Sequence, residues 1–301
     1  MKINITGVSG FVGKNISKYL SKSGIEIIDL SLRKTDWKNQ IDKNASAIIH
    51  LAGKAHDTKN TSSADEYFKV NRDLTIELFQ EFLNSHITDF FFFSSVKAVA
   101  DTVDGVLYED VIPNALTPYG QSKLEAETYL LNQKLPAGKR LFIIRPCMIH
   151  GPGNKGNLNL LYKVVEKGLP WPLAAFENKR SFLSIDNLSF LVLEMLQNKD
   201  VESGVYNFAD DETISTNQLI RIIGEATSKK SKLWGIPASL IKGVAKIGDK
   251  VKLPLNSERL KKLTESYVVS NQKIKTALGI NILPMSAEEG LQKTIKSFKK
   301  A

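Results

Sequence analysis

The sequence predicts an α/β protein with a Rossmann-type, doubly wound parallel sheet and a smaller C-terminal α/β lobe. Three observations predict it. Short apolar segments without polar alternation alternate with amphipathic segments through the first half of the chain. A glycine-rich turn follows the first apolar segment, and the pattern changes after residue 153. Apolar strands that are separated by helices are typical of a parallel sheet buried on both faces.

The first strands of this sheet are expected in five apolar segments, at residues 2–6, 25–30, 47–51, 89–93 and 141–144. Helices are expected between them, at residues 12–23, 63–85 and 119–132. Gly24 suits the position just after a helix, because glycine readily adopts the left-handed conformation found there.

Beyond residue 153 the expected elements are less regular. A polar loop leads into a helix, and a later helix has Ser215 as a suitable N-cap. Two further strands are expected to return to the sheet, and the rest of the chain is helical and rich in lysine. These elements are the loop at 154–159, the helices at 160–167 and 216–227, and the strands at 181–185 and 205–209.

The composition is that of a globular protein, since 42% of the 301 residues are hydrophobic and 24% are charged. These values exclude disordered, collagen-like and disulfide-scaffold proteins. Cys147 is the single cysteine, so no internal disulfide is expected, which suits a reducing compartment. No apolar run reaches about 18 residues, and the first strand begins at Lys2, without room for a signal peptide. We expect a cytoplasmic protein without an integral membrane segment.

The chain is basic, with 41 Lys and Arg against 32 Asp and Glu, a net charge of +9. One interpretation is an anionic partner, and the other is a solvated, lysine-rich surface. The positive charge is dispersed along the chain and no nucleic-acid recognition motif is present, so nucleic acid is not an expected partner.

The glycine-rich turn has the sequence GVSGFVG at residues 7–13, directly after a strand and at the start of a helix. The spacing of Gly7, Gly10 and Gly13 lets the backbone turn tightly and approach a pyrophosphate, which the amides at the helix N-terminus bind. The alternative is a tight turn whose glycines serve packing alone. Its place in the first strand–turn–helix unit favours a dinucleotide site.

The end of the second strand usually distinguishes NAD from NADP. Ser31 lies 18 residues beyond Gly13, and Arg33 follows it. A small hydroxyl with a guanidinium suits the 2′-phosphate of NADP, which a carboxylate would repel. If the strand ended earlier, Asp29 would instead be the carboxylate that binds the ribose of NAD. We prefer NADP, with NAD as the alternative.

A catalytic set is expected from Ser95, Tyr119 and Lys123. Ser95 follows the fourth strand, where ligands bind in open α/β sheets. Tyr119 and Lys123 are four residues apart on a helix that Thr117 caps and Pro118 begins, so they project together. A phenol with a pKa near about 10 needs a nearby positive charge to act as an acid and base at neutral pH. An ordinary helix pair is the alternative.

Together these motifs resemble the extended short-chain dehydrogenase/reductase family of NAD(P)-dependent nucleotide-sugar epimerases, dehydratases and reductases. The resemblance covers nearly the whole chain. It rests on TGVSGFVG at 6–13, IIHLAG at 48–53, Asn71 in the long helix, and Arg145-Pro146 with GPG at 151–153.

The resemblance implies a role for each matching residue. No metal site is expected, because the sequence shows no metal-ligand spacing. Ser95, Tyr119 and Lys123 would be catalytic, and Ser95 would also hold the substrate oxygen. The cofactor would contact Gly7, Gly10, Phe11, Val12, Gly13, Ser31, Arg33, Asp36, Trp37, Leu51, Ala52, Gly53, Asn71, Tyr119, Lys123 and Pro146. The substrate would contact Ser95, Lys97, Trp171, Pro172, Arg180 and Arg259.

The resemblance also implies a division of the chain. An NAD(P)-binding domain would comprise residues 1–154 with the returning segments at about 181–212. A lobe that binds the sugar nucleotide would comprise residues 155–180 and 213–301. A homodimer is expected by analogy with the family.

Departures from the family pattern narrow the activity. Relatives that are 4,6-dehydratases carry Asp and Glu after the catalytic Ser or Thr, whereas this chain has Val96 and Lys97. The segment SSVKAV resembles reductases of UDP-linked 4-keto-6-deoxy-N-acetylhexosamines. We therefore expect NADPH-dependent reduction at C4 of such a UDP-sugar, for surface polysaccharide synthesis. The alternatives are a UDP-sugar 4-epimerase with tightly bound NAD and, more remotely, a cofactor sensor without catalysis.

Other reactive residues are expected to be structural. His150 stands where relatives usually have Tyr and is interpreted as a packing residue, as are His50 and His56, and Cys147 is expected to be inert. Residues 237–252 mix aliphatic residues with lysines. This pattern is typical of a helix that packs on a core or a partner, and a peripheral membrane role is the alternative.

Overall fold

The computed structural model describes residues 1–54, 63–154, 157–251 and 256–298. Its centre is a six-stranded sheet in the order β2-β1-β3-β4-β6-β9, and every neighbouring pair is parallel. The strands are β1 (Lys2–Thr6), β2 (Glu26–Leu30), β3 (Ala47–His50), β4 (Asp89–Phe93), β6 (Arg140–Pro146) and β9 (Gly204–Phe208). This sheet confirms the predicted Rossmann-type fold.

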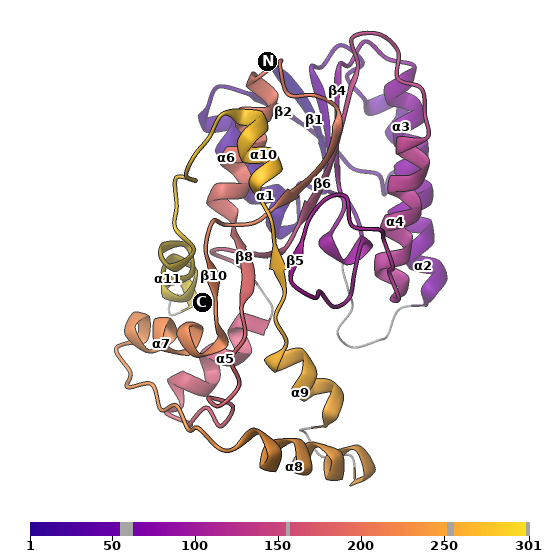
Figure 1. Cartoon of the computed structure of the whole chain (residues 1–301). Helices are drawn as coiled ribbons and strands as arrows, with labels where there is room; N and C mark the ends of the chain where they lie inside the picture. Colours follow the sequence, from indigo (N-terminus) through magenta and orange to yellow (C-terminus); the bar gives the residue numbers. More distant parts are fainter. Residues whose placement is uncertain (55–62, 155–156, 252–255, 299–301) are drawn as a thin grey trace.

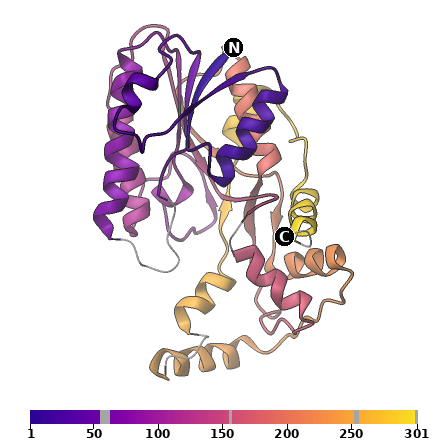
Figure 2. The ribbon, with the colours of Figure 1, turned by 180° about the vertical axis from the view of Figure 1, so that it is seen from behind.

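Helices cover both faces of the six-stranded sheet (Figures 1 and 2). Alternate residues of β4 show why, since Phe91 and Phe93 pack in one core cluster while Phe90 and Phe92 pack in another. One face carries α1 (Phe11–Lys22), α6 (Ile185–Gln197) and α10 (Gln272–Leu278). The other carries α2 (Ala64–Phe68), η2 (Lys69–Asp73), α3 (Leu74–Leu83) and α4 (Pro118–Leu131), with the short η1 (Trp37–Gln40). Both faces of the sheet are therefore buried.

Local signals in the sequence place several helix ends correctly. The Thr117 side chain accepts a hydrogen bond from the Gly120 N–H, and Pro118 opens α4. Ser215 forms a capping box with Gln218 at the start of α7 (Thr216–Thr227). Gly24 follows α1 with a φ of +78°. The helix expected over 63–85 instead divides into α2, the π-helical η2 and α3.

The strand expected at 181–185 does not join the central sheet, which corrects the prediction. It forms β8 (Arg180–Ser184), which pairs with β7 (Met148–His150) and β10 (Thr213–Ile214) in a separate three-stranded sheet. The edge beside β6 is taken by β9, and Phe182 and Leu183 of β8 pack in different core clusters. Strand β8 thus links the sheet end of the molecule to the lobe.

The lobe holds α5 (Asn157–Glu166), α7 and α11 (Ala287–Phe298), with α8 (Ala238–Val251) and α9 (Ser257–Thr264) at the end farthest from the six-stranded sheet (Figures 1 and 2). Strands β5 (Val106–Leu107) and β11 (Val268–Val269) pair between the two parts, and η3 (Val96–Ala98) follows β4. Helix α10 packs beside β9, so the chain returns to the sheet after α9. The division into two domains stays a prediction. No helix of the described residues is long and apolar enough to span a bilayer.

Candidate active site

The predicted site residues follow the carboxyl ends of three neighbouring strands. The glycine-rich turn follows β1, residues 51–53 follow β3, and Ser95 follows β4. In open α/β sheets, ligands bind at this edge of the sheet. The fold therefore brings the predicted cofactor and catalytic segments together.

The turn between β1 and α1 is packed too closely to accept a side chain at two of its glycines. Gly7 has a φ of +73°, and a Cβ there would lie 2.8 Å from the backbone nitrogen of Ala52. A Cβ at Gly13 would lie 2.2 Å from the carbonyl oxygen of Gly7. Helix α1 begins after Gly10 without a side-chain cap and without an acidic residue in its first turn. Its first N–H groups therefore suit the pyrophosphate of a dinucleotide.

The remaining residues predicted along the cofactor line the same edge. Phe11, Val12 and Leu51 are half-buried and pack on the first core cluster, and Ala52 faces Gly7. Pro146 is the last residue of β6, opposite Phe208 of β9. These apolar residues therefore lie at or near the carboxyl ends of β1, β3 and β6.

A buried chain of hydrogen bonds joins β1 and β3 to η2. Thr6 Oγ1 lies 2.7 Å from His50 Nδ1, and His50 Nε2 lies 2.9 Å from Thr75 Oγ1. The Thr75 hydroxyl donates to the Asn71 carbonyl oxygen, so Thr75 accepts from His50 Nε2–H and Nδ1 accepts from Thr6. Burial and the charge of Lys123 lower the pKa of His50 to about 3, so the ring is neutral. His50 is structural, as expected, whereas His56 lies outside the described residues.

Asn71 holds the segment that follows β3. Its Oδ1 accepts from the Lys54 N–H at 2.7 Å, and its Nδ2 donates to the Lys54 carbonyl and to Ser122 Oγ, both at 3.1 Å. A Cβ at Gly53 would lie 3.1 Å from Asn71 Oδ1 and 3.2 Å from Lys123 Nζ. Asn71 lies in the π-helical η2, a wide turn that is frequent at functional sites. Its amide groups thus position residues 53–54 against α4.

The three predicted catalytic side chains lie together. Tyr119 hydrogen-bonds Ser95, which also accepts from the backbone N–H of Lys97 at 3.2 Å as the N-cap of η3. Lys123 donates to the Phe93 carbonyl oxygen at 2.8 Å and is 5% exposed. The ring of Tyr67 packs edge-on against Tyr119 at 6.2 Å between centroids. A hydroxyl, a phenol and an ammonium therefore converge at the end of β4.

Burial dominates the charge state of this set. It lowers the pKa of Lys123 to about 8, against the smaller opposing effect of Glu127. It also raises the pKa of Tyr119, although the hydrogen bond from Ser95 acts in the other direction. We expected Lys123 together with the positive nicotinamide to lower the pKa of Tyr119, and the residues of the protein alone raise it. The phenol is thus a proton donor at neutral pH.

A buried ion pair that was not predicted from the sequence supports α4. Arg145 of β6 donates to Glu127 through Nε and Nη2, the latter at 2.6 Å, and the side chains are 4% and 1% exposed. Arg145 also donates to the Glu109 carbonyl oxygen at 3.2 Å. One feature of the sequence could have indicated a role for Glu127. Its spacing from Tyr119 and Lys123 places all three residues on one face of the helix.

The residues predicted to contact the adenosine part of the cofactor differ in their exposure. β2 ends at Leu30, so Ser31 is the first residue past the strand and Asp29 lies within it, paired with Ile5. Ser31 is half-buried and Arg33 is exposed. Asp36 is exposed and accepts from Gln40 at 3.0 Å, whereas Trp37 is 5% exposed in the core. An adenine contact by Trp37 would require this ring to leave the core.

Two predicted substrate residues lie on either side of Tyr267. Lys97 Nζ lies 4.2 Å from the centre of the Tyr267 ring and donates to the Asp101 carbonyl oxygen. Arg180 pairs with Tyr267 through the backbone and donates to the Lys262 carbonyl oxygen at 3.1 Å. Burial lowers the pKa of both cations. Lys97 and Arg180 therefore form a half-buried cationic cluster beside η3.

The other predicted substrate residues lie deeper in the lobe or on its surface. Trp171 is 7% exposed in the lobe core, and its indole N–H is buried without an acceptor among the described residues. Pro172 is half-buried, and Arg259 is exposed on α9. The structure therefore does not bring Trp171 and Arg259 together with the catalytic set.

The remaining reactive residues serve packing. His150 is fully buried, with Nδ1 2.9 Å from Thr294 Oγ1 of α11 and Nε2 3.7 Å from an oxygen of Asp210. Burial raises the pKa of the Cys147 thiol well above its usual value, which agrees with an inert cysteine. Within the described ranges, no group of His, Cys, Asp or Glu side chains could hold a metal ion.

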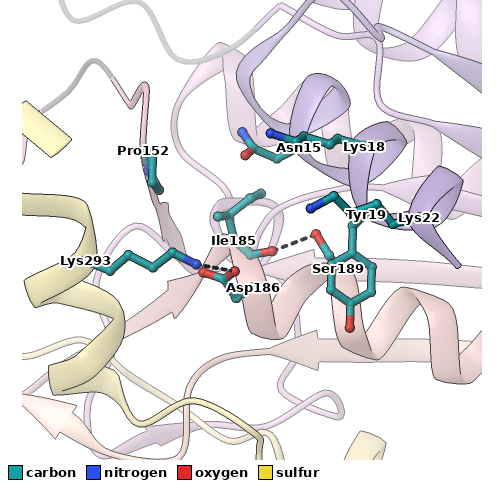
Figure 3. A pocket seen from close by; sticks show the side chains of 9 residues that line it. All are labelled: Asn15, Lys18, Tyr19, Lys22, Pro152, Ile185, Asp186, Ser189 and Lys293. Carbon is teal, nitrogen blue, oxygen red and sulfur yellow. Dashed lines mark hydrogen bonds and ion pairs between the residues drawn. The ribbon is translucent and has the colours of Figure 1, made fainter. Parts of the chain in front are cut away.

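A separate cavity of about 260 Å³ lies between α1, α6 and α11 (Figure 3). Lys18 and Lys22 reach it from α1, and Lys293 of α11 pairs with Asp186 at 2.7 Å. Pro152, Ile185 and Ser189 also line it. This cavity is distinct from the edge that holds the catalytic set.

The sequence agrees with one family over most of its length. Residues 3–209 match the model of the NAD dependent epimerase/dehydratase family, and the chain belongs to this family. The fold agrees as well, since the structure of RMD from Pseudomonas aeruginosa complexed with NADPH matches with a TM-score of 0.76 and 19% identity. That match covers 100% of this chain and 99% of the other.

Two curated relatives match nearly end to end. UDP-glucose 4-epimerase of Vibrio cholerae is 29% identical, over 99% of this chain and 96% of its own length. A second relative, from Escherichia coli O157:H7, is 26% identical over 97% of this chain and 93% of its own length. Its name is N-acetyl-alpha-D-glucosaminyl-diphospho-ditrans,octacis-undecaprenol 4-epimerase. These findings confirm the predicted family and its class, an enzyme that uses a nicotinamide cofactor.

The buried pair should be costly to break. Glu127→Gln leaves the Arg145 guanidinium buried without a counter-charge, so we expect the free energy of unfolding in urea to fall by about 3 kcal/mol. Glu125→Gln is the matched control, because it removes an exposed partner of Arg72 from the same helix and should cost less than about 1 kcal/mol. Equal losses in the two variants would contradict this role.

Lys123 should make stability rise with pH above about 8. Its pKa is about 8 in the folded protein against an ordinary value of 10.5, so the unfolded chain binds more protons between these values. Below this range the ammonium is present in both states and the penalty of burying it is complete. In urea unfolding without added nucleotide, we expect the stability of the wild type relative to Lys123→Met to grow by up to about 3 kcal/mol across this range. A difference that does not change with pH would refute the shifted pKa.

Proposed function

We propose that the protein transfers hydride at C4 of a UDP-linked sugar, as an NADPH-dependent reductase of a 4-keto-6-deoxy-N-acetylhexosamine for surface polysaccharides. The observation that carries this proposal is the convergence of Ser95, Tyr119 and Lys123 beside the glycine-rich turn. A cofactor sensor would need none of these groups in this arrangement. Their positions therefore support catalysis over sensing.

The cofactor fits the edge of the sheet that holds this set. Gly7 and Gly13 leave no room for a side chain, and α1 opens without a competing acidic cap. The turn would hold the pyrophosphate, and residues 51–53 would lie along the ribose and the nicotinamide. When it is bound, the nicotinamide supplies or accepts the hydride at C4.

The residues of the protein would manage the proton and the oxygen at C4. Tyr119 is protonated at neutral pH, so its hydroxyl would give a proton to the 4-keto oxygen during reduction. Ser95 would donate a hydrogen bond to the same oxygen and hold it near the phenol. The Lys123 ammonium would stabilise the phenolate that remains. Asn71 would act indirectly, by holding Gly53 and α4 in place.

The reductase form is supported by the end of β2 and by the residues after Ser95. Ser31 follows the strand directly, and the exposed Arg33 is close enough in sequence to bind a 2′-phosphate. Val96 and Lys97 carry no carboxylate for proton transfer at C5 and C6, which disfavours 4,6-dehydration. NADP is therefore the proposed cofactor.

The second candidate is a UDP-sugar 4-epimerase with tightly bound NAD. It is favoured by the two nearly full-length relatives, both of which are named 4-epimerases. In this form, Tyr119 would first take the proton of the 4-hydroxyl and later return it. The same three catalytic residues serve both forms.

The lobe would recognise the diphosphate of the substrate. Arg180 and Lys97 are the half-buried cations beside the catalytic set, and Arg259 would add an outer contact. Trp171 and Pro172 would lie near the nucleotide base, where the unsatisfied indole N–H of Trp171 offers a donor. A diphosphate-linked sugar is common to a UDP-sugar and to the polyprenol-linked substrate in the name of the Escherichia coli relative. The two-domain division, a homodimer and a cytoplasmic location complete the proposal.

Turnover by the purified protein tests this function. We expect steady oxidation of NADPH with a UDP-linked 4-keto-6-deoxy-N-acetylhexosamine, and Tyr119→Phe should lower the rate at least about 100-fold. Phe190→Leu, far from the set on α6, is a control that should keep most of the activity. Retained NAD with interconversion of two UDP-hexoses, and no NADPH oxidation, would replace the reductase by the epimerase. Near-normal activity of Tyr119→Phe would overturn both.

The choice of cofactor has its own test. Arg33→Ala should raise the KM for NADPH about tenfold and leave the KM for NADH unchanged, because a charged hydrogen bond to the 2′-phosphate is lost. Lys34→Ala is the matched control, since Lys34 is the neighbouring exposed cation and bonds Gln40 instead. Equal effects on both cofactors would rule out a 2′-phosphate contact.

A further inference from the structure

Helix α8 lies at the end of the molecule farthest from the six-stranded sheet (Figures 1 and 2). Part of its apolar surface is uncovered among the described residues. One side of α8 packs on the lobe through Ile241, Ala245 and Gly248, which are buried. The side chains of Leu240, Val244, Ile247 and Val251 are 62%, 46%, 58% and 61% exposed. Their spacing places them on one stripe of the helix, which we call the α8 apolar face.

The α8 apolar face differs from the scattered apolar residues found on any protein surface. Single exposed aliphatic residues such as Ile112 and Ile282 are common and need no explanation. Here four large aliphatic side chains adjoin one another along three turns of one helix. A contiguous stripe of this kind indicates a surface that is covered when the protein works.

The charged residues of α8 indicate what kind of surface covers the α8 apolar face. Lys242, Lys246 and Lys250 are exposed along an adjoining stripe, and no described residue forms an ion pair with them. Asp249, the one carboxylate of the helix, is bound to the N–H and hydroxyl of Ser257 in α9, at 2.9 and 2.6 Å. Asp249 keeps its negative charge, so the three exposed lysines and this one carboxylate leave α8 with a net charge of +2.

An anionic lipid surface is complementary both to the α8 apolar face and to the row of lysines beside it. A helix with aliphatic residues on one side and lysines beside them lies in the plane of a bilayer interface, with the lysines among anionic headgroups. A second copy of the chain fits less well, because a two-fold contact would bring the three lysines against their own copies. A protein partner also fits less well, since the face holds no Trp, Tyr or Arg of the kind that anchors protein interfaces.

We propose that α8 docks the protein peripherally on an anionic membrane surface, with the α8 apolar face buried at the headgroup boundary. The docking surface belongs to the lobe that carries the predicted substrate residues. Helix α8 packs on α9, and the Lys262 carbonyl of α9 accepts from Arg180. Docking would thus bring that lobe, rather than the outer end of the central sheet, to the membrane. The inference concerns attachment and does not depend on which C4 reaction the protein performs.

Vesicle flotation with the purified full chain tests the proposal without any measurement of activity. We expect the wild type to float with vesicles of phosphatidylethanolamine and phosphatidylglycerol, to bind phosphatidylcholine vesicles weakly, and to be released by raised salt. Ile247→Glu should lower the partition coefficient at least about tenfold. Ile282→Glu is the matched control, because it places the same charge at an exposed isoleucine outside α8 and should float like the wild type.

The lysines have a paired test of their own. Lys242→Gln with Lys246→Gln should lower binding to the anionic vesicles about tenfold or more. Lys18→Gln with Lys22→Gln removes the same charge from α1, beside the central sheet, and should change binding little. Unchanged thermal midpoints would show that each variant is folded, as expected for exposed positions.

Two outcomes would overturn the proposal. Undiminished flotation of Ile247→Glu would move the membrane contact away from α8. A wild type that does not float would exclude membrane docking altogether. In that case, light scattering would show whether Ile247→Glu abolishes a dimer, which would make the α8 apolar face a contact between copies, or leaves the mass unchanged, which would leave a protein partner.

Discussion

The position of the active-site helix α4 depends on the buried ion pair between Arg145 and Glu127. Two charges out of water are stable only when each satisfies the other, so the pair keeps α4 against β6 within a narrow range of positions. The helix also approaches η3 so closely that a Cβ at Gly120 would lie 2.3 Å from the Lys97 carbonyl oxygen. Because Tyr119 and Lys123 flank Gly120 on the same helix, these two restraints set the contacts of the phenol and of the ammonium.

A second restraint reaches α4 from the opposite side and carries no charge. Neutral hydrogen-bonding groups run from the end of β1 to α4, through Thr6, His50, Thr75, Asn71, Ser122 and the Tyr119 carbonyl oxygen. Each of these groups is satisfied inside the protein, so the chain tolerates burial without a counter-ion. Burial keeps the His50 ring neutral, so this chain of hydrogen bonds adds no second cation near Lys123. The site is thus held by one ionic and one neutral connection.

The sequence predicts best what depends on neighbours along the chain. The six central strands were located within one to two residues, the glycine-rich turn lies where its spacing puts it, and Thr117 and Pro118 begin α4 as expected. It predicts worst what depends on long-range competition. The segment of β8 had the composition of a sheet strand, yet β9 holds the edge beside β6, and Trp37 matched an adenine contact but packs in the core. The pairing of Arg145 with Glu127 was missed for the same reason, because the helical spacing places Glu127 on the face of Tyr119 and Lys123 but does not tell which strand that face meets.

The structure shows where the excess positive charge of the chain, +9 in total, lies on the molecule. Among the described residues, the buried Lys and Arg side chains are Arg145, which is paired with Glu127, and Lys123, which stays mostly an ammonium at neutral pH because its pKa is about 8. The excess must therefore lie on the surface, where most lysines are merely solvated or form weak exposed pairs. On α8 the situation differs, because unpaired lysines adjoin an aliphatic stripe that water solvates poorly. The lysines of α8 alone would bind any polyanion. The α8 apolar face alone would bind any apolar surface. Their coincidence on one helix narrows the match to a surface that is both anionic and apolar.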